Sequence, residues 1–144
     1  MILHDQTTFS DPDAGTHGDC ARACIATILQ IEPMILPHPI AEDGGWSGGF
    51  TKALRGLGWC YRSATYDART AKHPDLYDPS WGDFILPRLV MAAGPSPRGS
   101  WLHAVVWDRI AGKMIHDPHP SRDGLSAIAA LDYLAPYPKQ ESDQ

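Results

Sequence analysis

The stretch THGDCARACIATIL, residues 16–29, decides the fold predicted for this chain. Small residues lead into Asp19 and Cys20, and an apolar segment follows at once. Cys20, Cys24 and Ile28 are each four residues apart, which places them on one face of a helix. The same stripe takes in Ala23, Thr27 and Ile31. This spacing predicts a helix with one buried face.

Cys20 is placed by this pattern in the first turn of a helix that runs from about Cys20 to Gln30 and stops before Pro33. Asp19 suits the N-cap position. Unpaired N–H groups and the helix dipole in the first turn favour a negative charge by roughly 0.3–1 kcal/mol. A thiol there is biased toward the thiolate, the form that acts as a nucleophile. The alternative is that Cys20 only begins the core stripe.

The composition is that of one globular domain over residues 1–144, with a polar tail from about residue 138. A net charge of −5 argues against a nucleic-acid binder or a membrane-surface protein. No apolar run approaches a membrane span, and the start lacks a signal-peptide pattern. The odd number of cysteines, 3, argues against a disulfide framework. A reducing compartment, the cytoplasm, fits better.

The predicted elements place helices first and an antiparallel sheet second, which is an α+β architecture. A second helix is expected from near Ser47 through FTKALRGL, with Gly58 as its C-terminal cap. The segment 125–134 is compatible with a short helix or a last strand. Strands are predicted at 59–66, 84–86, 89–93, 101–107 and 113–117, the last two joined by a hairpin turn at DRIAG.

His103 and Asp117 lie on the two strands of this predicted hairpin. The turn centres on about Ile110, and reflecting 103 across it gives 2 × 110 − 103 = 117, so the two residues should face each other. Cross-strand neighbours lie roughly 4.5–5.5 Å apart at Cβ. An aspartate bonded to one imidazole nitrogen leaves the other free for a nucleophile. Together with Cys20 they would form a Cys–His–Asp triad.

Three motifs, GDCARACIATIL, LHAVVWD and MIHDPHPSRDGL, resemble the papain-like cysteine peptidases. The nearest branch is that of the bacteriocin-leader (double-glycine) peptidases and their small stand-alone relatives. The DQT near the start, the SPRG loop and HDPHPS also look like small phage- and prophage-encoded proteins of this type. The resemblance runs from about Asp5 to Leu125. It implies a papain-like fold in which the nucleophile helix packs on a C-terminal antiparallel sheet.

The resemblance also implies roles for four residues. Cys20 would be the nucleophile, His103 the general base and acid, and Asp117 the residue that orients the imidazole. The family places a glutamine upstream of the cysteine, whose amide helps to form the oxyanion hole. Gln6 is the only glutamine before Cys20, but it lies 20 − 6 = 14 positions away, further than the usual gap. The insertion around SDPDAGT would have to loop out.

Other chemistry-bearing residues have a competing structural interpretation. Arg98 in the SPRG loop and Trp46 are the candidate substrate-binding residues. The structural alternative is a surface charge for Arg98 and a core or pocket-wall side chain for Trp46. Cys24 and Cys60 are expected to be residues of the hydrophobic core. His116 and His119, on either side of Asp117, are expected to face solvent or to bond the backbone.

The predicted function is therefore a cysteine hydrolase that cleaves a peptide or isopeptide bond through a thioacyl intermediate. No cofactor or metal is required, and the partner is a peptide or protein substrate. Leader peptides, ubiquitin-like tails, cell-wall peptides and small amides all suit the same three residues. One alternative is a non-catalytic papain-like binding module. The other is a metal site of His116, Asp117 and His119 with His103 or Cys20, although HDPHP lacks the usual zinc spacing.

Overall fold

The computed structural model describes residues 1–40, 49–65 and 87–137. Its helices are α1 (Cys20–Leu29), the 3-10 helix η1 (Pro33–Ile35) and α2 (Thr51–Gly56). Its strands are β1 (Trp59–Thr65), β2 (Leu89–Pro95), β3 (Leu102–Asp108), β4 (Lys113–His116) and β5 (Ala130–Pro136). The α+β class predicted from the sequence is confirmed.

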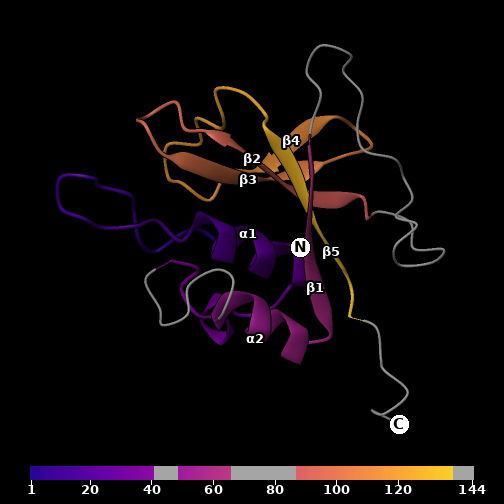
Figure 1. The fold of residues 1–144 in the computed structure, drawn as a ribbon. Helices are drawn as coiled ribbons and strands as arrows, with labels where there is room; N and C mark the ends of the chain where they lie inside the picture. Colours follow the sequence, from indigo (N-terminus) through magenta and orange to yellow (C-terminus); the bar gives the residue numbers. More distant parts are fainter. Residues whose placement is uncertain (41–48, 66–86, 138–144) are drawn as a thin grey trace, which may run out of the picture.

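The five strands form one sheet in the order β1-β5-β2-β3-β4, and every neighbouring pair is antiparallel (Figure 1). The segment 125–134, which was compatible with a helix or a strand, enters β5 at Ala130, and β5 lies between β1 and β2. Alternate residues of β5 enter two different core clusters, with Leu134 in one and Leu131 in the other. Burial on both faces explains why ALDYLAP lacks the alternation of a half-exposed strand.

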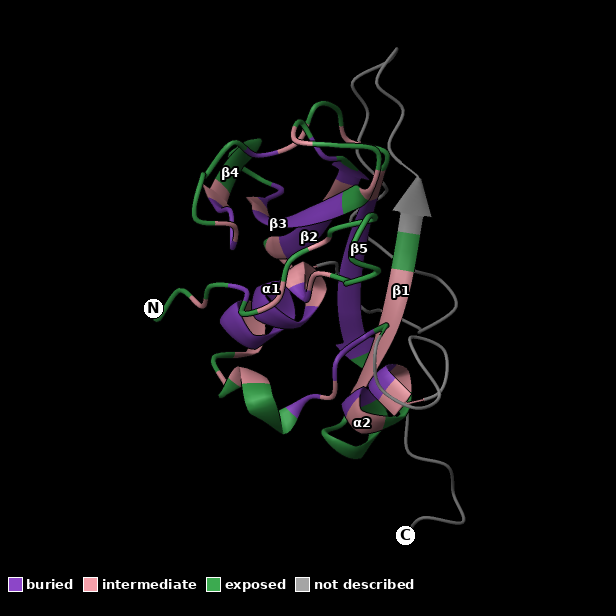
Figure 2. Cartoon of the chain, turned by 90° about the vertical axis from the view of Figure 1, so that its left-hand side faces the viewer, coloured by how far each residue is buried: buried purple, intermediate pink, exposed green. Residues whose placement is uncertain are grey.

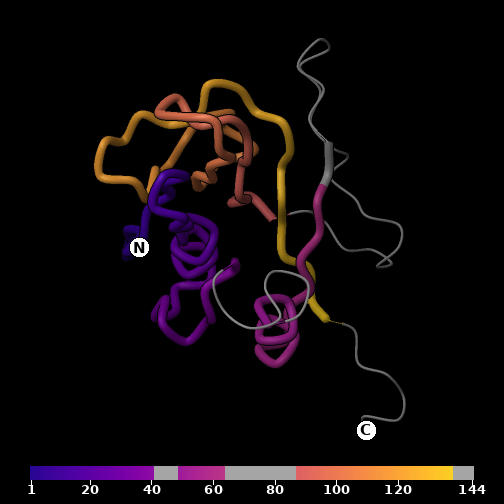
Figure 3. The backbone as a smooth tube through the Cα atoms, turned by 60° about the vertical axis from the view of Figure 1, so that its left-hand side comes forward, coloured from indigo at the N-terminus to yellow at the C-terminus, as the bar shows by residue number. Residues whose placement is uncertain are grey.

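Helix α1 packs against β3 and β2 and is buried around most of its circumference, as the burial colours in Figure 2 show. The expectation of a single buried stripe was too narrow, because residues 22–27 are all buried. The N-terminal arm and η1 account for the side of α1 that the sheet does not cover. His4 N donates to Thr27 Oγ1 at 2.9 Å, and η1 contacts the helix (Figure 3).

Asp19 occupies the N-cap position of α1, as predicted, but its side chain makes no capping hydrogen bond. Its carboxylate instead accepts the Thr7 and Thr8 backbone N–H groups at 2.8 and 2.9 Å. It also accepts two bonds from the buried Arg22 guanidinium, at 3.1 and 2.8 Å. Asp19 therefore anchors the N-terminal arm to the start of α1, directly beside Cys20.

The β3–β4 hairpin turns at residues 109–112, as predicted, but its register differs from the prediction. Asp108 pairs with Lys113, and a bulge between Val106 and Trp107 then shifts the pairing to Val106 with His116. The register predicted from residues 103 and 117 therefore differs from the observed one by one position near the turn and by two positions beyond the bulge. A bulge adds one residue to one strand, and a simple reflection cannot foresee it.

Helix α2 lies inside the second predicted helix, and Gly58 follows it with a φ of +91° that favours glycine. The described residues contain no helix with the length and apolar character needed to cross a membrane. Several predicted features lie outside the described residues: Ser47 at the start of the second helix, Trp46, the strand at 84–86 and the polar tail from 138.

Candidate active site

Cys20 is the first residue of α1, the helix that packs against β3, and it is half-buried. The thiol is free. It lines two hollows, a cleft of about 370 Å³, called the large cleft below, and a neighbouring one of about 20 Å³, the small pocket. His103 lines both hollows as well, so the two predicted reactive residues face the same space.

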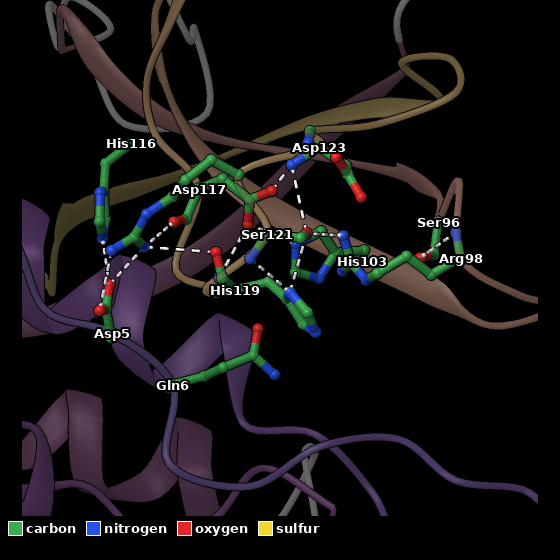
Figure 4. A network of polar contacts seen from close by, with 12 residues as sticks. Asp5, Gln6, Ser96, Arg98, His103, His116, Asp117, His119, Ser121 and Asp123 are labelled. Atoms are coloured by element: carbon green, nitrogen blue, oxygen red, sulfur yellow. Dashed lines mark hydrogen bonds and ion pairs between the residues drawn. The ribbon is translucent and has the colours of Figure 1, made fainter.

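His103 lies on β3 and is 3% exposed. Its Nε2 lies 2.7 Å from Asp117 Oδ1, and the two side chains form a buried ion pair when the imidazole is protonated (Figure 4). Because Nε2 is committed to Asp117, Nδ1 is the ring nitrogen left for the thiol. Cys20 and His103 line the same two hollows, and the proximity of Cys20 is one of the causes that raise the pKa of His103. The structure thus brings the three predicted triad residues together.

Asp117 follows the last residue of β4 and is 1% exposed. Its Oδ1 accepts the His119 backbone N–H at 2.9 Å, and its Oδ2 accepts the Gly124 N–H at 2.7 Å. Gly124 has a φ of +74°, a conformation that other residues adopt only with strain. The loop that follows β4 therefore wraps around the carboxylate and fixes its direction toward His103.

The charges of this pair are strongly coupled. Burial alone would lower the pKa of His103, but the hydrogen bond with Asp117 and the interaction with Cys20 raise it to about 9. Burial would raise the pKa of the Asp117 carboxyl group, yet the hydrogen bonds from His103, His119 and Gly124 lower it to about 2. Near neutral pH the arrangement favours an imidazolium beside the thiol.

Gln6 is 7% exposed and lines the small pocket together with Cys20 and His103. Its backbone N–H donates to Pro118 O at 3.0 Å, and its Nε2 donates to Thr8 O at 2.8 Å. The segment between Gln6 and α1 forms a loop closed by the Asp11–Thr16 bridge, so Gln6 lines the small pocket with Cys20 despite the long sequence gap. Within the described part of the chain, Gln6 Oε1 is buried without a hydrogen-bond partner.

Arg98 also lines the small pocket, while its guanidinium donates from Nη1 to Ser121 Oγ at 3.0 Å. Its Nε is buried and has no partner among the described residues. Arg98 thus borders the site rather than pointing away from it. Trp46, the other candidate for substrate binding, lies outside the described residues.

The two histidines that flank Asp117 in sequence point in different directions. His116 is buried, which excludes the solvent-facing option, and its Nε2 lies 3.0 Å from His4 O and 3.1 Å from Asp5 Oδ1. The His119 ring packs edge-on to the His103 ring at 6.3 Å between centroids. Among the described residues, no group of three His, Cys, Asp or Glu side chains is arranged to hold a metal ion.

Arg122 is a supporting residue that the sequence pattern did not single out. It donates to the backbone oxygens of Asp117 and His119, and it pairs with Asp5 on the N-terminal arm. An arginine in a polar loop carries no periodic signal, so only the fold reveals this contact.

Three further polar residues were also missed, and all three line the large cleft: Tyr61, Ser63 and Asp132, which we call the Asp132 cluster. Tyr61 Oη donates to Asp132 Oδ2, and Ser63 Oγ donates to Oδ1 at 2.5 Å. Asp132 lies on β5, the element that the sequence left undecided, so its partners were not predictable.

The comparisons with known proteins identify no relative of this chain. No family model, no curated protein and no solved structure matches the chain. The chemistry of the site is therefore inferred from its own residues.

Proposed function

We propose that this protein is a cysteine hydrolase that cleaves a peptide or isopeptide bond with Cys20, His103 and Asp117. The observation that carries the proposal is the 2.7 Å contact of buried His103 with Asp117, in a hollow that the half-buried Cys20 also lines. A nucleophile, a base and a residue that orients the base, in contact in that order, are the requirements for nucleophilic acyl transfer.

In the proposed reaction the Cys20 thiolate attacks the carbonyl carbon of the scissile amide, and the carbonyl oxygen becomes an oxyanion. The C–N bond then breaks as protonated His103 gives its proton to the leaving nitrogen. The amine departs and a thioester remains on Cys20. A water molecule gives a proton to His103, attacks the thioester and releases the carboxylic acid, which restores the Cys20 thiolate and the protonated His103.

Two N–H donors are suited to the oxyanion. The backbone N–H of Cys20 lies in the first turn of α1, where no helical acceptor is available to it. The second donor is the Gln6 amide, since one Nε2 hydrogen bonds Thr8 O and the other is left for a ligand in the small pocket. Removal of one such donor typically costs about 2.7–4 kcal/mol in the barrier.

We further propose that the fold is papain-like, with α1 as the nucleophile helix on a C-terminal antiparallel sheet. The packing of α1 on β3 and β2 supports this arrangement. The substrate partner is a peptide or protein. A reduced thiol is required for the reaction, which favours a reducing compartment such as the cytoplasm.

The proposal is tested with a library of internally quenched peptides and isopeptide-linked substrates. Wild type should cleave at least one member, and Cys20→Ala should abolish that cleavage. Cys60→Ala is the matched control, because it removes a thiol that does not line the large cleft. Cleavage that survives in Cys20→Ala would contradict the assignment. Retained binding of a substrate without cleavage by wild type would favour the non-catalytic alternative.

A further inference from the structure

We propose that the large cleft selects substrates with a positively charged ammonium or guanidinium group, which pairs with Asp132. The inference rests on the proposed function, because it concerns the substrate of the same Cys20 site. It starts from the position of the Asp132 cluster inside the hollow that Cys20 and His103 line.

The sheet places Asp132 on the face that α1 covers. Ser63, Asp132 and Met91 are Cα partners in a row across β1, β5 and β2. Directly opposed residues of antiparallel strands project to the same face. Met91 belongs to the core cluster that includes Cys24 of α1, so this face is the one that carries the reactive thiol.

Asp132 is a charge that the described part of the chain does not neutralise. It is 8% exposed, and its partners there are the hydroxyl groups of Tyr61 and Ser63 rather than a cation. Burial and the neighbouring carboxylate raise the pKa of Tyr61, so Tyr61 stays a hydroxyl donor to Asp132. Buried charges in proteins are usually paired.

A purely structural tie between β1 and β5 would not need this charge, since hydroxyl or amide acceptors would also hold Tyr61 and Ser63. A carboxylate has about four lone-pair sites, and two hydroxyl donors leave the others for a ligand. The rest of the cleft would hold the apolar part of a substrate. Its other lining residues are Ala21, Met91, Ala93, Leu102 and Ala104.

The test compares three methanethiosulfonate reagents, which modify Cys20 without needing a substrate: cationic aminoethyl, anionic sulfonatoethyl and neutral methyl. The rate with the cationic reagent is divided by the rate with the anionic reagent. Because both reagents modify the same thiolate of Cys20, this ratio is independent of the fraction of Cys20 that is ionised. Asp132→Asn should lower this ratio about tenfold, the effect of one charge-assisted hydrogen bond. Asp13→Asn, which removes a charge from an exposed turn, should leave it unchanged. Peptide mapping by mass spectrometry confines the measurement to Cys20.

An unchanged ratio in a folded Asp132→Asn protein would overturn the inference. Where that variant is unstable, Tyr61→Phe with Asp132→Leu removes donor and acceptor together and should give the same loss. Peptide substrates with Lys in place of norleucine, each with a free or acetylated N-terminus, then identify the source of the cation. Equal kcat/KM for all four peptides would also overturn it. Absence of any Cys20-dependent cleavage would instead refute the proposed function, while the reagent ratio would still report on Asp132.

Discussion

His103 Nε2 and Asp117 Oδ1 lie 2.7 Å apart although the two residues are not partners in the sheet. The Cα partner of His103 is Gly94 on β2, and β4 ends at His116. The contact therefore depends on the loop after β4, which turns the carboxylate back over β3. The loop is itself fixed by the N–H groups that it donates to Asp117.

Asp117→Asn should lower turnover by about 10²–10⁴-fold, because the imidazole loses the partner that fixes its tautomer and direction. Initial rates on the best library substrate check this. Asp123→Asn, an exposed neighbour on the same loop, is the control and should retain wild-type rates. Equal rates for Asp117→Asn and wild type would remove Asp117 from the site.

The same pair should make stability depend on pH. The pKa of His103 is raised from 6.5 to about 9, so its contribution is full below pH 6.5 and is lost as the pH rises through 9. The pKa of Asp117 is lowered from 3.8 to about 2, so its contribution is full above pH 3.8 and is lost as the pH falls through 2.

The difference in unfolding free energy between wild type and Asp117→Asn should therefore be largest between about pH 4 and pH 6.5, at about 2–3 kcal/mol. Urea titrations at a series of pH values measure it. A difference that grew between pH 7 and pH 9 would contradict this account, because it would mean that loss of the His103 proton strengthens the contribution of the His103–Asp117 pair to stability.

Gln6→Ala should reduce turnover by about 10²–10³-fold through loss of an oxyanion donor. Alkylation of Cys20 by iodoacetamide forms no oxyanion, so its rate should remain that of wild type. Gln6→Met fills a similar volume and should behave like Gln6→Ala, which separates hydrogen bonding from packing. A parallel fall in alkylation and turnover would mean that Gln6 only supports the position of Cys20.

Arg22→Met should destabilise the protein by about 3–5 kcal/mol, because it leaves the buried Asp19 carboxylate without its cation. The exposed ion pair between Asp5, on the same arm, and Arg122, in the loop after β4, offers a contrast. Asp5→Asn should cost about 1 kcal/mol or less. Unfolding in urea compares the two variants, and similar losses for both would contradict the anchoring role given to Asp19.

The sequence predicted the elements that have a local signal. The helix at Cys20, the β3–β4 hairpin and the α+β class follow from spacing and turn residues, and the structure confirms them. The extent of burial around α1 was not predictable, because it depends on the arm and η1 packing on the side away from the sheet. The position of β5 between β1 and β2 depends on long-range pairing, which leaves no local pattern.

For the site, residue type and order were sufficient to select Cys20, His103 and Asp117, and the structure places them together. The bulge at Val106 and Trp107 and the loop after β4 set the actual geometry, and neither has a clear sequence signal. The Asp132 cluster was missed for the same reason, since its members come from two strands far apart in the chain.

The most direct test of the central claim is the rate at which iodoacetamide modifies each cysteine of the folded protein at pH 6. The proposed site places a cationic His103 beside Cys20, so Cys20 should react fastest, and His103→Ala should reduce its rate to that of an ordinary thiol. Burial raises the pKa of Cys24, which serves as the unreactive internal control. If Cys20 is unmodified at pH 6, or reacts no faster than in His103→Ala, then Cys20 is not an activated nucleophile and α1 is only a core helix.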